Sequence, residues 1–188
     1  MNKKTKKLAQ ISLLVSIIVL FSIPPMNSIN FTATFGITLA FFPVLVGAIL
    51  MGPISGLILG AIWGVCSFCQ ALAGIDLGPL LLSISPIGTF IVCTIPRAIV
   101  GLLTGLIYNS LGKKEPHSYI AASVAAPVMN TILFLGSFWL LFTGVFAEYL
   151  LPILSSIITI NALIEAAAGL VIGAPIASAL DKAINKSS

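Results

Sequence analysis

The sequence predicts an all-α integral membrane protein with six transmembrane helices and both termini in the cytoplasm. Of its 188 residues, 59% are hydrophobic and only 7% are charged, and the mean hydropathy is +1.17. Soluble domains carry roughly 25% charged residues, so most of this surface must face lipid. The chain also divides into six apolar segments, with lysines only before the first, between the fourth and fifth, and after the last. These observations exclude a soluble protein and predict one membrane domain over residues 1–188.

The first predicted span follows a basic N-terminus (1–7) and ends at Pro24-Pro25. It resembles a signal peptide, but no A-x-A-like cleavage site precedes the prolines, so we expect a retained helix. Gly52-Pro53 leaves room only for a tight turn between the second and third spans, because the residue before a proline easily leaves helical geometry. The six predicted spans are 8–23, 37–51, 54–73, 88–111, 118–143 and 152–180.

The lysines predict the orientation of the helices. If the N-terminus is cytoplasmic, every lysine lies inside: in the first seven residues, at Lys113 and Lys114, and in the tail 181–188. The only charged residues in the external loops are then Asp76 and Glu148. The positive-inside rule therefore predicts cytoplasmic termini. An anionic bilayer surface explains the net charge of +4, and no nucleic acid partner is needed.

Two external segments, 24–36 and 74–87, are long enough to cover a binding site. Both are rich in loop-forming residues, and loops at the mouth of a bundle often carry lids or ligand contacts. The alternative is that they only connect helices.

Two ionisable side chains fall inside predicted spans, Arg97 in the fourth and Glu165 in the sixth. Charges in the membrane are costly, so each is a candidate for a functional site. At 1.5 Å per residue, Arg97 and Asn161 lie roughly 13 Å below the outer end of their spans, and Asn130 and Glu165 about 18–20 Å. Four polar groups from three helices thus share one level of the bundle.

These groups permit two interpretations. Asn161 and Glu165 are four residues apart and project from one face of a helix, so they can face Arg97 across the bundle. The first interpretation is a buried Arg97–Glu165 ion pair that only holds helices together. The second is a polar site for a small hydrophilic molecule, with Arg97 donating, Glu165 accepting and Asn130 and Asn161 doing both. Gln70, near the outer end of the third span, is a further candidate.

Motifs for catalysis or metal binding are missing from the sequence. Cys66-x-x-Cys69 has no second cysteine pair, and His117 is distant in sequence, so these cysteines fit packing better than zinc. No P-loop, H-E-x-x-H or G-x-S-x-G motif occurs. We therefore expect a protein that is not an enzyme, with no catalytic residue, metal or cofactor in this chain. Any energised transport would be powered by another chain or by an ion gradient.

Small residues four apart allow close approach of helices. Gly56-x-x-x-Gly60 and Gly101-x-x-x-Gly105 in the third and fourth spans are expected to pack internally. Ser12-x-x-x-Ser16 in the first span could equally be a surface for another protein.

Several runs resemble the substrate-binding S components of energy-coupling factor (ECF) vitamin transporters. The run from Pro43 to Gly56 (PVLVGAILMGPISG) resembles the second and third spans of that family. Ile95-Pro96-Arg97-Ala98-Ile99-Val100-Gly101, Asn130-Thr131 and Asn161-Ala162-Leu163-Ile164-Glu165 are similar to the pantothenate-type members. The resemblance covers about residues 8–180 and is more specific for the family than for the vitamin.

The resemblance implies a six-helix subunit that captures a vitamin, best pantothenate, outside the cell. It further implies partners: a transmembrane T component and two cytoplasmic ATPases that use the ATP, with the S component rotating in the membrane to carry its pocket inward. The family's A-x-x-x-A surface for the T component would fall on Ser12 and Ser16, and Arg97 would suit the carboxylate of pantothenate.

Four alternatives stay open at this point. The ligand could be another vitamin, such as riboflavin or a pyridoxine or pyrimidine precursor, and a neutral or cationic one would rely on Glu165. A stand-alone secondary carrier would transport without ATPases. A membrane-embedded enzyme would need a nucleophile or acidic motif, and a structural scaffold would bind no ligand.

Overall fold

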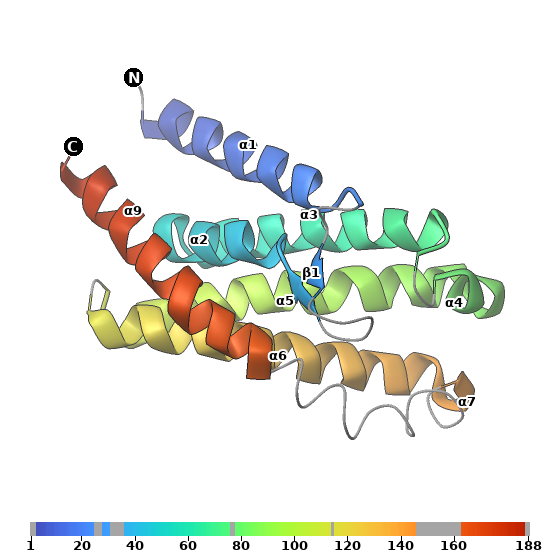
Figure 1. The fold of residues 1–188 in the computed structure, drawn as a ribbon. Helices are drawn as coiled ribbons and strands as arrows, with labels where there is room; N and C mark the ends of the chain where they lie inside the picture. The colour runs from blue at the N-terminus through green and yellow to red at the C-terminus, as the bar shows by residue number, and fades with distance from the viewer. Residues whose placement is uncertain are drawn as a thin grey trace.

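Four helices in the described part of the chain are long and apolar enough to cross a membrane. The computed structural model describes residues 3–24, 28–30, 36–75, 78–113, 115–145 and 163–186. The four helices are α3 (Pro53–Leu72), α5 (Pro86–Ser110), α6 (Pro116–Leu141) and the last helix, Leu163–Ala183. The last helix contains a π-helical turn, η2 (Gly169–Gly173), and continues as α9 (Ala174–Lys186). Figure 1 shows α3, α5 and α6 running side by side.

Two further helices are apolar, but their apolar parts are shorter than those of the four helices above. α1 (Lys3–Phe21) begins inside the lysine run, which shortens its apolar part. α2 (Phe41–Met51) has 11 residues, so it extends only about 16 Å, half of a hydrocarbon core about 30 Å thick. It ends at Gly52, whose φ of +92° suits glycine and makes the expected tight turn into α3. Six complete spans therefore remain a prediction, although the six apolar segments are helical in most of their described residues.

The segments between the helices contain more structure than expected. The second span was predicted to start at residue 37, which was wrong because Gly36–Thr38 forms strand β2, antiparallel to β1 (Ser28–Asn30). The β-branched side chains of Ile37 and Thr38 favour extended backbone. The all-α fold class is supported, and this two-stranded hairpin is an addition to it. Two short helices, α4 (Gly78–Ile84) and α7 (Thr143–Val145), were not predicted either, because they are too short to show a periodic pattern.

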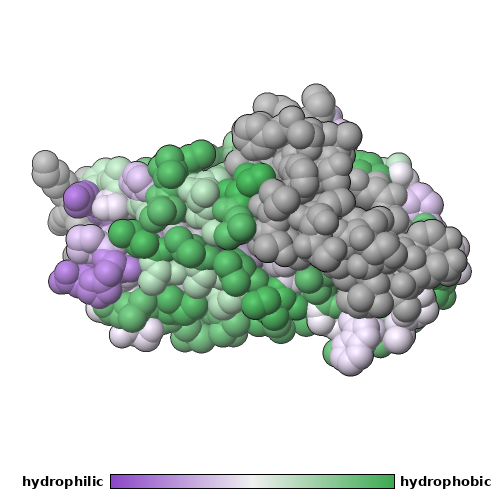
Figure 2. Space-filling model, turned by 60° about the horizontal axis from the view of Figure 1, so that its bottom comes forward, coloured by the Kyte–Doolittle hydropathy of each residue, from purple (hydrophilic) through white to green (hydrophobic). Residues whose placement is uncertain are grey.

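The two ends of the described chain lie at the same end of the bundle, together with the α2–α3 and α5–α6 turns (Figure 1). We call it the lysine end, because Lys6, Lys7, Lys113 and Lys182 belong to these segments. Figure 2 shows hydrophilic residues gathered at this end and apolar surface over the adjoining helices. These four lysines thus lie at one end of the bundle, and the side of the membrane that this end faces stays a prediction.

The closest helix contact in the bundle joins α3 to α5 through glycines. A Cβ atom on Gly56 would lie 2.2 Å from the carbonyl oxygen of Gly101, and one on Gly101 would lie 2.0 Å from that of Gly56. A Cβ atom on Gly60 would lie 2.2 Å from the carbonyl oxygen of Arg97. The two backbones touch, so the predicted internal packing of both glycine pairs is confirmed. The main core around this contact contains Ile18, Val44, Leu45, Leu59, Trp63, Val100, Ala122 and Ala126.

We expect Gly101→Ala to destabilise the protein, since the added methyl group forces α3 and α5 apart. Overpacking of this kind costs about 1–3 kcal/mol, and the apparent Tm of the detergent-purified protein should fall. Gly136→Ala is the matched control, because a Cβ atom at this exposed α6 glycine meets nothing within 4 Å. Equal Tm values for the two variants would contradict the proposed contact.

Candidate functional site

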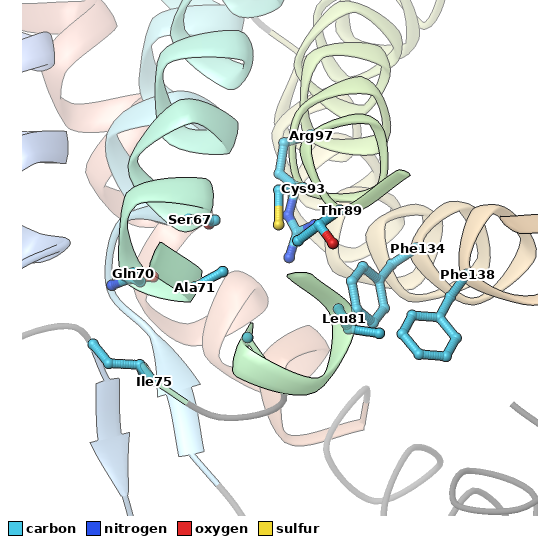
Figure 3. A pocket seen from close by; sticks show the side chains of 11 residues that line it. Ser67, Gln70, Ala71, Ile75, Leu81, Thr89, Cys93, Arg97, Phe134 and Phe138 are labelled. Carbon is cyan, nitrogen blue, oxygen red and sulfur yellow. The ribbon is translucent and has the colours of Figure 1, made fainter. Parts of the chain in front are cut away.

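A cavity of about 190 Å³ lies between α3, α4, α5 and α6, away from the lysine end. Figure 3 shows the side chains that surround it. Three helices contribute rows of residues spaced by about one turn, and α4 adds Leu81 from the end of the bundle. The lining residues are Ser67, Gln70, Ala71, Ile75, Gly78, Leu81, Thr89, Cys93, Arg97, Phe134 and Phe138.

Arg97 is the charged group of this cavity, and Pro96 explains how it is held. Proline has no N–H, so Pro96 cannot donate to the carbonyl of Val92, four residues earlier. The Nη1 atom of Arg97 donates to that oxygen instead, at 2.8 Å. The guanidinium also lies 4.7 Å from the ring centroid of Phe134 and 5.7 Å from that of Trp63, within cation–π range.

The guanidinium of Arg97 keeps unused donors in this arrangement. Its Nε atom is buried and has no hydrogen-bond partner, although a guanidinium offers five N–H groups. A buried cation with open donors favours an anionic group, and a carboxylate can accept two parallel hydrogen bonds from it. The cavity is therefore suited to a small solute that carries an acid.

Glu165 lies near this cation without pairing with it. Its Oε1 atom accepts a hydrogen bond of 3.2 Å from the Thr38 hydroxyl, which ties strand β2 to the last helix. The charges of Arg97 and Glu165 are close enough to attract each other, but the two described side chains form no ion pair. The structure thus differs from the first interpretation of the sequence, in which these residues bind one another.

The other candidate residues have different positions. Asn130 lies on α6 one turn from Phe134, does not line the cavity, and has a buried Oδ1 atom without a hydrogen-bond partner. Asn161 lies outside the described residues. Gln70 lines the cavity, but its Nε2 atom donates to the carbonyl of Ser22 at 2.6 Å, which links α3 to the end of α1. Of the predicted residues, the structure brings Arg97 and Gln70 to the cavity itself.

Ser12 and Ser16 are both exposed on α1. The Ser16 hydroxyl donates to the carbonyl of Ser12 at 3.0 Å, so it bonds to its own helix. This leaves a surface of small side chains that another helix can approach closely. The three cysteines are free, and no cluster of three potential metal ligands occurs among the described residues.

Several lining residues were missed in the sequence. They follow a simple spacing: steps of four back from Arg97 give Cys93 and Thr89, and steps of four from Asn130 give Phe134 and Phe138. Residues four apart share a helix face, so these rows could have been found from the two polar residues. Leu81 could not, because α4 was not predicted.

Comparisons with known proteins agree with this architecture. The family model for the ECF transporter substrate-specific component matches residues 6–177. The pantothenic acid transporter PanT of Lactococcus lactis subsp. cremoris is 32% identical over 160 residues, which cover 80% of each chain. The pantothenate transporter PanT of Leuconostoc mesenteroides is 28% identical, over 95% of this chain and 94% of its own.

A solved structure of ThiT from Listeria monocytogenes has a similar fold. Its TM-score is 0.54 at 14% sequence identity, over 100% of this chain and 97% of that one. The two PanT relatives are named as transporters, and the ThiT structure supports the fold. The family match covers most of the sequence, and the apolar helices fit the same conclusion: the chain is a multi-pass membrane protein that belongs to the family of ECF transporter substrate-specific components.

Proposed function

We propose that this chain binds pantothenate outside the cell, for ATP-driven uptake with a T component and two cytoplasmic ATPases. The relatives named as pantothenate transporters support the choice of vitamin. The observation that carries it is Arg97, whose guanidinium lines the cavity and whose buried Nε atom has no hydrogen-bond partner. The ATP would be used by the partners, and this chain would need no cofactor.

The chemistry of pantothenate fits the lining residues. Its carboxylate would bind Arg97, and its amide and hydroxyl groups would meet polar side chains such as Ser67 and Thr89. Its dimethyl group would pack against Phe134 and Leu81. A cavity of about 190 Å³ is small for a flavin or a folate, and the charge of Arg97 disfavours cationic thiamine.

Three further residues keep a proposed role in binding. Glu165 lies near Arg97 and would accept from a ligand hydroxyl, and Asn130 has an acceptor without a partner. Asn161 precedes Glu165 by one helical turn. On the outside of the bundle, the small side chains of Ser12 and Ser16 form the proposed surface for the T component.

The first test compares pantothenate with pantothenol, in which an alcohol replaces the carboxylate. For the purified chain, calorimetry should give about 100-fold tighter binding of pantothenate, because losing one partner of a buried charge pair costs about 2–5 kcal/mol. Arg97→Gln should weaken pantothenate binding by a similar factor and remove the preference for pantothenate over pantothenol.

Lys182→Ala is the control for this test, since it removes an exposed cation at the lysine end. It should leave both affinities unchanged. A well-folded Arg97→Gln protein that still prefers pantothenate would refute the assigned role of Arg97. Tight binding of another vitamin in its place would change the substrate and keep the family.

Glu165→Gln distinguishes two roles of this carboxylate, because they predict changes of opposite sign in the affinity for pantothenate. If Glu165 accepts from a hydroxyl of the ligand, the affinities for pantothenate and pantothenol should both fall, by about 10-fold, or 1.4 kcal/mol. If it acts only as a negative charge near the site, the affinity for anionic pantothenate should rise and that for pantothenol should not change. We expect the first result.

The pair Ser12→Leu and Ser16→Leu tests the partner surface. Two large side chains on this face should prevent close approach of another helix, so co-purification with the T component and uptake into proteoliposomes should be lost. Pantothenate binding to the isolated chain should stay normal. Gly136→Leu, another enlargement at an exposed helix position, serves as the control and should leave the complex intact. A stable complex of the double serine variant with the T component would rule out this surface. Separately, uptake into proteoliposomes that contain this chain and no ATPases would favour a secondary carrier.

A further inference from the structure

A second cavity, of about 300 Å³, lies at the lysine end of the bundle. It forms where α2 and α5 end and α9 passes across them. It shares no lining residue with the cavity of Arg97, and none of the sequence motifs pointed to it. Its lining consists of Ile49, Leu50, Met51, Gly52, Pro53, Tyr108, Asn109, Lys113 and Asp181.

The inner part of this cavity carries negative charge. Asp181 contributes a carboxylate, whose Oδ2 atom accepts a hydrogen bond of 2.6 Å from Tyr119, and a carboxylate can accept several such bonds. Two helices, α2 and α5, also end at the cavity, and the last carbonyls of a helix carry a partial negative charge. Ile49 adds a specific acceptor, because the residue four positions later is Pro53, which has no N–H. This combination favours a cation with several N–H donors.

The outer part of the cavity carries the opposite charge. Lys113 lines it from the exposed turn after α5, the helix that also contributes Asn109. An ammonium group attracts phosphate as a point charge. A ligand that matches both parts has an ammonium group inside and an anionic group near Lys113.

The surroundings indicate that this ligand is a lipid. Next to the lining residue Pro53, Ile54 is 64% exposed, and next to Asp181, Leu180 is 41% exposed. Leu106, one turn before Asn109, is 46% exposed. In a membrane protein such side chains face acyl chains, and Figure 2 shows that hydrophilic and apolar surface meet at this end. The cavity therefore lies where phospholipid headgroups are found.

We propose that this cavity binds the headgroup of a phospholipid that carries a primary ammonium, such as phosphatidylethanolamine. The ammonium donates to Asp181 and to the carbonyls at the end of α2, and the phosphate lies against Lys113. Phosphatidylcholine has no N–H donor for these acceptors, and phosphatidylglycerol has no cation. The site stabilises the α2–α3 turn, the end of α5 and α9 against one another.

The test measures lipid binding by the full chain after delipidation in detergent. Phosphatidylethanolamine, phosphatidylcholine and phosphatidylglycerol with the same acyl chains are added, and bound lipid and Tm are measured by native mass spectrometry and thermal unfolding. We expect a retained adduct and a rise in Tm at least about 3 °C larger with phosphatidylethanolamine. Soluble glycerophosphoethanolamine should compete only at much higher concentration; equally strong binding would identify a soluble ligand instead. Equal effects of the three lipids would overturn the proposal.

Variants at the two charged residues locate the effect. Asp181→Asn should reduce the effect of phosphatidylethanolamine to that of phosphatidylcholine, because it removes the charged acceptor of the ammonium. Lys113→Ala should reduce the effects of both lipids, because both carry the phosphate that Lys113 contacts. Lys182→Ala, an exposed lysine at the same end that does not line the cavity, should retain the preference. If Asp181→Asn fails to fold, Lys113→Ala alone decides, and an undiminished rise in Tm with phosphatidylethanolamine there overturns the proposal. Pantothenate affinity of Lys113→Ala should equal that of the wild type, so this test and that of the vitamin site are independent.

Discussion

The contact between the backbones of α3 and α5 determines where Arg97, the charged residue of the first cavity, lies. Gly60 has no side chain, so the α5 backbone at Arg97 approaches α3 until their atoms touch. The Arg97 side chain is thereby excluded from the contact and extends to the space between α3, α4 and α6 (Figure 3). The same closeness lets Ser67 of α3 face Thr89 and Cys93 of α5 across one small cavity. A helix pair separated by larger side chains would hold these rows too far apart to enclose a small solute.

The partners of Arg97 explain how a cation can lie between the helices and still offer a donor to an acidic group. A buried ion pair with Glu165 would satisfy the charge, but a ligand would then have to break it, at a cost of several kcal/mol. The structure uses weaker partners instead: one carbonyl, of Val92, and the faces of two aromatic rings. Glu165 is bonded to Thr38 and supplies opposite charge without contact. An anion can therefore bind Arg97 without displacing a carboxylate.

Much of the fold could be predicted because it depends on patterns of composition. The long apolar helices, the Gly52-Pro53 turn and the internal packing of the glycine pairs each follow from one physical rule, and the structure bears them out in the residues that it describes. Arg97 stood out because a charge in a span is rare. The hairpin of β1 and β2 and the short helix α4 could not be predicted, because three to seven residues carry no readable period. For the same reason the bond between Thr38 and Glu165, residues far apart in sequence, was not foreseen, and neither was Leu81 at the cavity. Depth in the membrane does not decide whether polar residues meet, because each helix can be rotated about its own axis. Asn130 shows this: its depth was predicted to match that of Glu165, yet it does not line the cavity.

At both cavities, a proline leaves a backbone carbonyl oxygen without its usual hydrogen-bond donor. Each proline withholds an N–H from the carbonyl four residues earlier, and in a membrane such an oxygen must find another donor. Pro96 leaves the oxygen of Val92, which Arg97 occupies, so the proline next to the arginine also orients it. Pro53 leaves the oxygen of Ile49 at the lysine end, beside Asp181, where a ligand ammonium can donate. The C-terminal end of α5 acts in the same sense at the second cavity, because its last carbonyls carry a partial negative charge. At the first cavity the charge comes from the Arg97 side chain in the middle of the same helix, so α5 presents opposite charges to the two cavities.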